Sequence, residues 1–365
     1  MNSFQHWLKE GKQVNIGERE LHERVRGALR SCLRNVPFLE IRKVESEPGG
    51  EDLPPDLLIS LELSGTERQL IIEARKSGQP RLAREAANQL LRYKERYPGA
   101  YGVFAAPFIS AKAAEICFKE ELGYVDLSGN CRLCFDRIYI EKQGNPNLFA
   151  EKRDLRTLYS PRAQRILRVL LSGPGKSWKT RELSEEARVS LGQVSNVRKL
   201  LADREWIRTE PDGFLLSDPE ALLHEWGENY STRKNRIRDF YTLKSVPEFE
   251  AGLASICAQE GLAYALTGFS AAGRLAPAVR RQKVHAYLEE AGTVLASLLG
   301  MKEVPSGANV SLLTPYDEGV FYGTREIDSI RIVSPVQIYL DLLGLRGRGE
   351  EAAAALLEEV IRPQW

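Results

Sequence analysis

The chain has 365 residues, of which 43% are hydrophobic and 28% charged, a composition that indicates two or three globular domains and excludes a largely disordered or fibrous protein. Its 51 basic and 50 acidic residues leave a net charge of +1, so any surface for nucleic acid must be local. No apolar run reaches the roughly 20 residues that cross a bilayer, residues 1–16 lack the apolar core of a secretory signal, and five cysteines argue against a disulfide framework. We therefore expect a cytoplasmic protein with reduced thiols and no membrane partner.

Residues 1–150 alternate helix and strand patterns and are expected to form the first domain. Helical spacing of apolar residues covers 18–33, 82–96 and 110–121, the last with Ser110 as N-cap. Short apolar runs predict strands over 57–63, 69–74, 100–106 and 124–127, the first two joined as a hairpin. Loops are expected at 47–50 and 144–147. The order αββαβαβ predicts a mixed sheet with helices on both faces.

Two carboxylates of this hairpin are placed at neighbouring strand ends. Asp56 opens the first strand, and Glu73 lies near the end of the second, where Arg75 points to the same face. Such a pair of oxygen ligands can hold a divalent cation, which would polarise a phosphodiester and activate water. Gln89 and Tyr93 lie four apart, on one face of the following helix. A purely structural interpretation stays open, in which Asp56 caps a strand and Glu73 pairs with a neighbouring cation.

The segments Pro55-Asp56, Glu73-Ala74-Arg75 and Gln89-Leu90-Leu91-Arg92-Tyr93 resemble the PD-(D/E)xK nuclease superfamily, including the QxxxY helix of its RecB-like members, over about residues 18–140. Arg75 stands where the family has Lys, and Arg cannot be deprotonated. Strand alternation sends the adjacent Lys76 to the opposite face unless a bulge intervenes. The resemblance implies Asp56 and Glu73 as ligands of Mg²⁺ in an active enzyme, but we expect a degenerate domain without cofactor. The implied catalytic set is Asp56, Glu73, Arg75, Lys76, Gln89 and Tyr93.

Cys131 and Cys134 form a CxxC motif within an expected strand over 132–139. No second pair of zinc ligands follows nearby, and a redox pair would need a helix start. The two cysteines are therefore interpreted as small apolar residues. The four histidines, His6, His22, His224 and His285, are scattered along the chain and are assigned no role.

Residues 151–227 predict three helices followed by a hairpin. Ser160-Pro161 begins the first helix and 173–175 end it. Thr180 is expected to cap the second, and Ser190 the third, which runs over 192–203. Asp212-Gly213 between two apolar runs predicts the hairpin. From residue 152 to 208 there are 14 basic and 6 acidic residues, a local excess of +8.

This arrangement resembles a winged helix-turn-helix and is similar to bacterial transcription regulators. The resemblance implies that the third helix enters the major groove of double-stranded DNA, with Gln, Asn and Arg contacting bases and other cations contacting phosphates. A winged helix used only for protein contacts stays open, and the acidic hairpin tip at 210–212 argues against insertion of the wing into a groove. The implied DNA-binding residues are Lys179, Arg181, Ser190, Gln193, Ser195, Asn196, Arg198, Lys199 and Arg208.

Residues 228–245 carry several charges and helix formers without Gly, and predict a helical linker. Over 246–365 the pattern predicts strands at 263–267, 283–288 and 310–314. It predicts helices from Ala271, at 334–343 and at 350–361, with a break at 346–349. The turn Gly268-Phe269-Ser270 is similar to that of nucleotidyltransferases, but the next strand lacks the carboxylate pair that would hold magnesium. Transferase activity is therefore rejected, and a degenerate nucleotidyltransferase-like domain is expected.

Residues 158–365 as a whole resemble the AbiEi family of type IV antitoxins. The segments that carry this resemblance are the winged helix, 266–272, and 333–342 with its continuation through 347–353. The resemblance implies a repressor of its own operon, whose partner toxin is a separate nucleotidyltransferase encoded nearby. A homodimer is plausible.

The fold expected is thus α/β multidomain: a restriction-endonuclease-like mixed sheet, a winged helix-turn-helix, and a degenerate nucleotidyltransferase-like α/β domain. The function expected is DNA-binding transcription regulation of the antitoxin type. The alternatives are a metal-dependent DNA endonuclease targeted by the winged helix, and an interaction scaffold that does not bind DNA.

Overall fold

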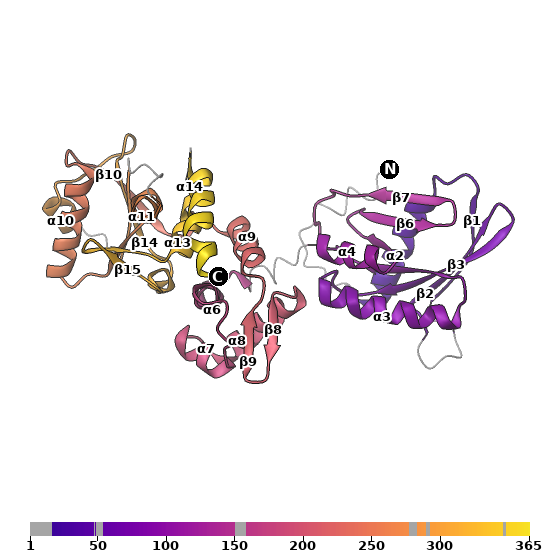
Figure 1. Ribbon diagram of the computed structural model, residues 1–365. Coiled ribbons are helices and arrows are strands. Elements are labelled where there is room, and N and C mark those ends of the chain that lie inside the picture. Colours follow the sequence, from indigo (N-terminus) through magenta and orange to yellow (C-terminus); the bar gives the residue numbers. More distant parts are fainter. Residues whose placement is uncertain are drawn as a thin grey trace. The chain divides into compact units, whose positions relative to one another are not determined.

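The computed structural model describes residues 17–46, 48, 54–149, 158–276, 283–289, 293–345 and 348–365. The chain divides into two compact units, residues 1–151 and 152–365, and each contains one seven-stranded sheet (Figure 1). The expected loop at 47–50 falls outside the described residues except for Pro48, and so do the domain boundary at 150–151 and Arg346-Gly347 of the expected helix break. None of the helices in the described ranges has the length and apolar character needed to cross a membrane.

The first sheet is mixed and follows the chain order from β1 to β7. Its outer pairs are antiparallel, whereas β3, β4 and β5 are parallel. The crossovers between these parallel strands are helices, as parallel pairing requires. The strands are β1 (Leu39–Ser46), β2 (Leu57–Leu63), β3 (Thr66–Ala74), β4 (Tyr101–Ala106), β5 (Gly123–Asp126), β6 (Cys131–Phe135) and β7 (Ile138–Lys142).

Helices cover both faces of this sheet, as the element order predicts. The helix α2 (Glu18–Leu33) packs its buried side against one face, in a core cluster that includes Ile59 and Ile72. The helices α3 (Pro80–Arg96) and α4 (Ala111–Lys119) pack on the other, against Ile71 and Phe104. Ile71 and Ile72, which are adjacent in β3, therefore pack in the cores on opposite faces of the sheet, because side chains alternate along a strand.

Two predictions for this unit are corrected. The strand expected over 132–139 is two strands, because Asp136 adopts a left-handed φ of 50° in the turn between β6 and β7. Cys131 is buried and Cys134 exposed, so the CxxC motif does not present both thiols on one side. The strand β1 was not expected, because its charged and polar residues alternate without a clear apolar face.

The second unit begins with three helices and a two-stranded antiparallel hairpin. These are α6 (Pro161–Ser172), α7 (Thr180–Glu186), α8 (Leu191–Asp203), β8 (Ile207–Glu210) and β9 (Gly213–Leu216). The Ser160 and Ser190 side chains cap α6 and α8 as expected. Thr180 is not the N-cap of α7: Lys179 occupies that position, and the helix has no side-chain cap.

The second sheet is also mixed, in the order β13-β10-β14-β12-β11-β16-β15. Its strands are β10 (Arg236–Tyr241), β11 (Tyr264–Thr267), β12 (Val284–Leu288), β13 (Lys302–Glu303), β14 (Val310–Thr314), β15 (Arg325–Ile327) and β16 (Ile330–Ile332). The helices of this part are α9 (Pro219–Asn229), α10 (Val246–Gln259), α11 (Gly268–Leu275), α12 (Thr293–Leu298), α13 (Pro335–Leu343) and α14 (Gly349–Leu356). Short 3₁₀ helices lie at η1 (Thr232–Lys234), η2 (Glu318–Phe321) and η4 (Arg362–Gln364), and the π-helical turn η3 (Leu357–Ile361) follows α14.

The helical linker expected over 228–245 is wrong. That segment contains the end of α9, the short helix η1 and the strand β10, which pairs antiparallel with β14. Helix propensity is worth only tenths of a kcal/mol per residue, and sheet pairing with a distant strand overrides it. Residues 152–365 form one compact unit, and its described residues share one hydrophobic core cluster.

Candidate functional site

The structure brings Asp56, Glu73 and Arg75 together beside the ends of β2 and β3. One carboxylate oxygen of Asp56 accepts the backbone N–H of Ala74 at 2.7 Å. The Nη1 atom of Arg75 lies 2.5 Å from Oε1 of Glu73 and 3.9 Å from Oδ2 of Asp56. The guanidinium thus ion-pairs with both carboxylates.

Helices on both faces of the sheet complete this cluster. Tyr93 on α3 donates its hydroxyl hydrogen to the Pro54 carbonyl at 2.9 Å, and Gln89 hydrogen-bonds to Tyr93. His22 on α2, which sequence reasoning left without a role, places Nε2 3.8 Å from Oδ1 of Asp56. The sequence indicates the burial of His22, because the helical spacing of α2 places it among the apolar residues of that helix. Lys76 is exposed and is not among the residues that this cluster brings together.

Burial sets the protonation of the two carboxyls. Burial, helped by the nearby Asp56 charge, raises the pKa of Glu73 to about 7, although Arg75 opposes the shift. Burial also raises the pKa of Asp56, against its backbone hydrogen bond and the charges of His22 and Arg75. The Oε2 atom of Glu73 is buried without a hydrogen-bond partner among the described residues.

Asp56 and Glu73 are the two carboxylates at the position where the resemblance implies Mg²⁺, and Arg75 pairs with both. In the described part of the chain, no three His, Cys, Asp or Glu side chains group as metal ligands. Magnesium usually keeps several waters and is bound by one or two protein carboxylates. Here the Arg75 guanidinium already supplies the positive charge between the two carboxylates.

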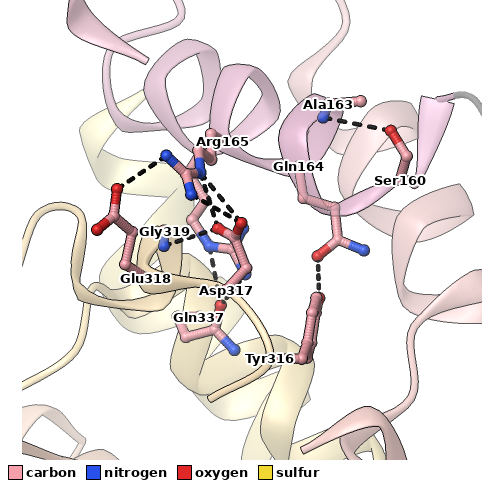
Figure 2. Close-up of polar contacts among 10 residues, drawn as sticks. Ser160, Ala163, Gln164, Arg165, Tyr316, Asp317, Glu318, Gly319 and Gln337 are labelled. Atoms are coloured by element: carbon pink, nitrogen blue, oxygen red, sulfur yellow. Dashed lines mark hydrogen bonds and ion pairs between the residues drawn. The ribbon is translucent and has the colours of Figure 1, made fainter. Parts of the chain in front are cut away.

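In the second unit, α6 is fixed to the body of the second sheet by polar side chains (Figure 2). Arg165 binds both carboxylate oxygens of Asp317, at 2.9 Å from each, and Oε1 of Glu318 at 2.9 Å. The Tyr316 hydroxyl donates to Gln164. Arg168, one turn further on, donates from Nη2 and Nε to Oε1 of Gln337 on α13, at 2.6 and 3.0 Å.

A buried network continues from Gln337 into the second sheet. Its centre is the carboxyl of Asp341, which accepts hydrogen bonds from Thr267 at 2.6 Å, Tyr230 at 2.8 Å and Tyr287 at 2.9 Å. Burial raises the pKa of Asp341, and these donors oppose the shift. Hydrogen-bonded side chains thus link α6 to Thr267, the residue that precedes α11.

Gly268-Phe269-Ser270, expected as a turn, are instead the first residues of α11, and this end of the helix is closely packed. Gly268 has φ +55°, and a Cβ there would lie 3.0 Å from Leu345 and 3.3 Å from His285. The Ser270 hydroxyl donates to the Lys283 carbonyl and accepts the backbone N–H of His285. On β12, the positions after Val284 carry His285, Ala286 and Tyr287, so the strand provides no carboxylate pair for magnesium.

Part of the basic excess between 152 and 208 is used in contacts within the fold. Arg165 and Arg168 hold α6, and Arg204, also buried, donates to Glu225 at 3.2 Å. Arg181 and Arg208 pair with Glu185 and Glu210 at 3.0 and 2.7 Å, on exposed sites where such pairs are weak. The count of charges in sequence therefore overstates the basic surface.

The helix α8 separates its residues into a core side and a solvent side. Val194, Val197 and Leu201 are buried. Ser195, Asn196 and Lys199 are exposed as expected, and so are Ser190 and Leu191, the latter by 53%. Two predicted base-contacting residues differ. Gln193 is half-buried with Nε2 shielded from solvent, and the half-buried Arg198 guanidinium lies 5.0 Å from the centre of the Phe214 ring.

A groove of about 480 Å³ lies beside the amino-terminal end of α8. It is lined by residues of α6, α7 and the turn between α7 and α8, among them Arg162, Arg165, Arg188 and Ser190. Arg188 adopts a left-handed φ of 51°, a conformation that costs a non-glycine residue about 1 kcal/mol. The sequence analysis assigned no role to Arg162, in the first turn of α6, or to Arg188, in the turn after α7, because neither lies on the outward face of the third helix.

The hairpin packs against the three helices through Phe214, which forms an isolated antiparallel bridge with Trp178. Its tip carries Asp212, which is 88% exposed and 3.9 Å from Nζ of the exposed Lys179. The acidic tip that the sequence indicated is therefore at the surface.

Comparison with known proteins gives one family match. Residues 215–362 match the model of the family described as transcriptional regulator, AbiEi antitoxin, type IV toxin–antitoxin system. The matched region begins in β9 and includes the second sheet, and it leaves out α6, α7 and α8. No curated protein matches the chain.

Two solved structures are similar to part of the chain. One is EndoMS in complex with double-stranded DNA, at 16% identity over 32% of this chain and 47% of that chain, with a TM-score of 0.24. The other is EndoMS in its apo form, at 14% identity over 28% and 44%, with a TM-score of 0.21. The chain thus spans less than half the length of either EndoMS chain.

Proposed function

We propose that this protein is a DNA-binding transcription regulator of the antitoxin type, in which α6 to β9 form a winged helix and α8 enters the major groove of double-stranded DNA. The observation that carries the proposal is the division of α8. One side is seated in the core through Val194 and Val197, and the other presents Ser195, Asn196 and Lys199 to solvent. An exposed polar helix seated on a second helix is the arrangement by which helix-turn-helix proteins bind DNA.

The cations around α8 support duplex DNA as the ligand. Arg162 and Arg188 line the groove beside its first turn, and Lys179 is exposed in front of α7. These positions suit phosphates, which fix the orientation of the protein without specifying sequence. The amino-terminal end of α8 adds the partial positive charge of the helix dipole.

The family match supports the regulatory part of the proposal, because the matched family is described as a transcriptional regulator and antitoxin. By this resemblance we propose that the protein represses its own operon and that its partner toxin is a nucleotidyltransferase encoded nearby. A homodimer bound to a palindromic operator is the corresponding assembly.

We propose further that the first unit is a restriction-endonuclease-like domain that has lost catalysis. The support is the pairing of Arg75 with Glu73 and Asp56, where an active site of this class would hold a cation. The unit would then serve as a binding module, because a fold can outlast its chemistry.

Regulation is tested by titrating a labelled duplex of the DNA upstream of the gene, beside a scrambled duplex of equal composition, at physiological salt. We expect the upstream duplex to bind at least about 10³-fold more tightly. Equal affinity for the two duplexes would contradict sequence-specific regulation. If the protein binds neither duplex, the result would support the alternative of an interaction scaffold that does not bind DNA.

Catalysis is tested by incubating supercoiled and linear DNA with the protein and Mg²⁺ or Mn²⁺, beside the Glu73→Ala variant. We expect neither protein to cut. Cleavage by the wild type that Glu73→Ala and Asp56→Ala both abolish, in folded protein, would make this chain the metal-dependent endonuclease of the alternative hypothesis.

A further inference from the structure

We propose that Leu191 determines part of the DNA sequence specificity by contacting the 5-methyl group of a thymine in the major groove. Leu191 is the first residue of α8, and its side chain is 53% exposed. The proposal rests on the proposed function, since it assigns a base contact to the same helix. This contact takes the place of the base contacts by Gln193 and Arg198 that the sequence suggested, because both side chains are half-buried.

The position of Leu191 on α8 is that of a groove-facing residue. Residues four and eight positions further along lie on the same side of a helix, and these are the exposed Ser195 and Lys199. Its neighbour Gly192 has no side chain, and a Cβ there would meet nothing within 4 Å. The Leu191 side chain therefore extends beyond its small or polar neighbours, Gly192 and Ser195.

The first turn of a recognition helix is the part that reaches base edges. Ser190 fixes this turn, because its hydroxyl oxygen accepts the backbone N–H of Gln193 at 3.2 Å. Leu191 is thus held on a capped, ordered turn. The two long polar residues of α8 are less available, since Gln193 is half-buried and Arg198 lies over the Phe214 ring.

The chemistry of the major groove identifies the occupant. Among the groups that the four base pairs present there, the thymine 5-methyl is the apolar one that a leucine can contact. Arg162 and Arg188 line the groove beside the first turn of α8, and Lys199 is exposed two turns further along the same side of the helix. These cations favour a polyanion over an apolar protein surface. An exposed leucine among cations and polar side chains can contact the methyl group of a thymine while the cations bind the flanking phosphates.

The experiment uses the full-length protein and DNA selected by it from a pool of random 20-base-pair duplexes. The selected duplex is made with thymine and with deoxyuridine, which lacks only the methyl group. Affinities are measured by fluorescence anisotropy for the wild type, Leu191→Ala and Leu298→Ala. Leu298, on α12, is 52% exposed and is the matched control. Single thymine-to-uracil substitutions then locate the contacted base.

For the wild type we expect each contacted methyl that is removed to weaken binding about fourfold, the value of one buried methyl-sized group. Leu191→Ala should weaken binding to the thymine duplex by a similar factor and show no further loss with uracil. Leu298→Ala should behave as the wild type. Non-additivity of this kind reports contact between the two groups.

Three outcomes would overturn the proposal. The wild type could bind thymine and uracil duplexes equally, Leu191→Ala could keep the full uracil penalty, or the pool could yield no shared sequence although DNA binds. In the first two outcomes the protein still binds a selected DNA sequence, so the proposed function survives, whereas the third would also contradict sequence-specific regulation. Absence of any salt-sensitive DNA binding would instead remove the proposed function and this inference together.

Discussion

Arg165 on α6 and Asp317, which precedes η2, form a two-pronged ion pair between residues 152 positions apart in sequence. The Asp317 side chain is only 9% exposed, and its Oδ1 also accepts the backbone N–H of Gly319 at 2.8 Å. The pair therefore fixes α6, the first helix of the proposed DNA-binding region, to the segment that precedes η2, beside the groove that Arg162 and Arg188 line.

Removing Asp317 should destabilise the second unit. Hydrogen bonds to a charged, partly buried group contribute about 1.5–3 kcal/mol, so we expect Asp317→Ala to lower the free energy of unfolding by about 2 kcal/mol in urea denaturation. The control is Glu318→Ala, because Glu318 binds the same arginine but is 61% exposed, and exposed pairs contribute at most about 1 kcal/mol. Equal losses in the two variants would contradict the structural role assigned to Asp317.

The buried carboxyl of Asp341 gives a second stability prediction. Thr267→Val keeps the shape of the side chain but removes the hydroxyl that donates to Asp341 at 2.6 Å, where both residues are almost fully buried. Loss of one donor to a buried carboxyl should cost about 1–3 kcal/mol of unfolding free energy.

The control for this variant is Thr209→Val, on the exposed side of β8. We expect it to change the free energy of unfolding by less than about 0.5 kcal/mol. A Thr267→Val protein as stable as the wild type would mean that the remaining donors, Tyr230 and Tyr287, satisfy Asp341 without Thr267.

Local features of this chain could be predicted from sequence because neighbouring residues cause them. Ser110, Ser160 and Ser190 each cap a helix, as predicted, by accepting a backbone N–H three residues later. The approach of Asp56 and Glu73 was also predictable, since a hairpin brings its two open ends together.

Features that depend on distant partners could not be predicted. The strand β10 pairs with β14, where Phe240 lies opposite Val310. The residues near position 240 contain no pattern that predicts this distant partner. The burial of Arg168 and Arg204 is of the same kind, because their acceptors lie on other helices. Sequence counts both arginines as surface charge. Likewise Gln193 follows the outward helical pattern, but side-chain packing shields its amide nitrogen.

The raised pKa of Glu73 predicts a dependence of stability on pH. Its folded value is about 7 and its ordinary value 4.5, so between these pH values the folded protein holds a proton that the unfolded chain has lost. Stability must therefore fall as pH rises from 4.5 to 7. Glu73→Gln has no such proton, and we expect it to be more stable than the wild type by up to about 3 kcal/mol at pH 8.

Urea denaturation at pH 4.5, 6 and 8 measures this difference, which should almost vanish at pH 4.5. Glu67→Gln is the matched control, because Glu67 is an exposed residue of the same strand. A Glu73→Gln protein that is less stable than the wild type at pH 8 would show that the ionised carboxylate, paired with Arg75, stabilises the fold. That result would reverse the expected sign of the pH dependence.

Substitution of Arg188 should change the affinity for DNA without lowering the free energy of unfolding. Glycine adopts the left-handed φ of 51° without strain, so Arg188→Gly should leave the free energy of unfolding unchanged or raise it by up to about 1 kcal/mol. The same substitution removes a cation from the groove beside α8. If that cation binds a phosphate, affinity for duplex DNA should fall, and the slope of log affinity against log salt should decrease by about 0.9. Arg188→Lys keeps the charge and should keep the slope. An unchanged slope in Arg188→Gly, in a protein that still binds DNA, would mean that the phosphates lie elsewhere on the surface around α8.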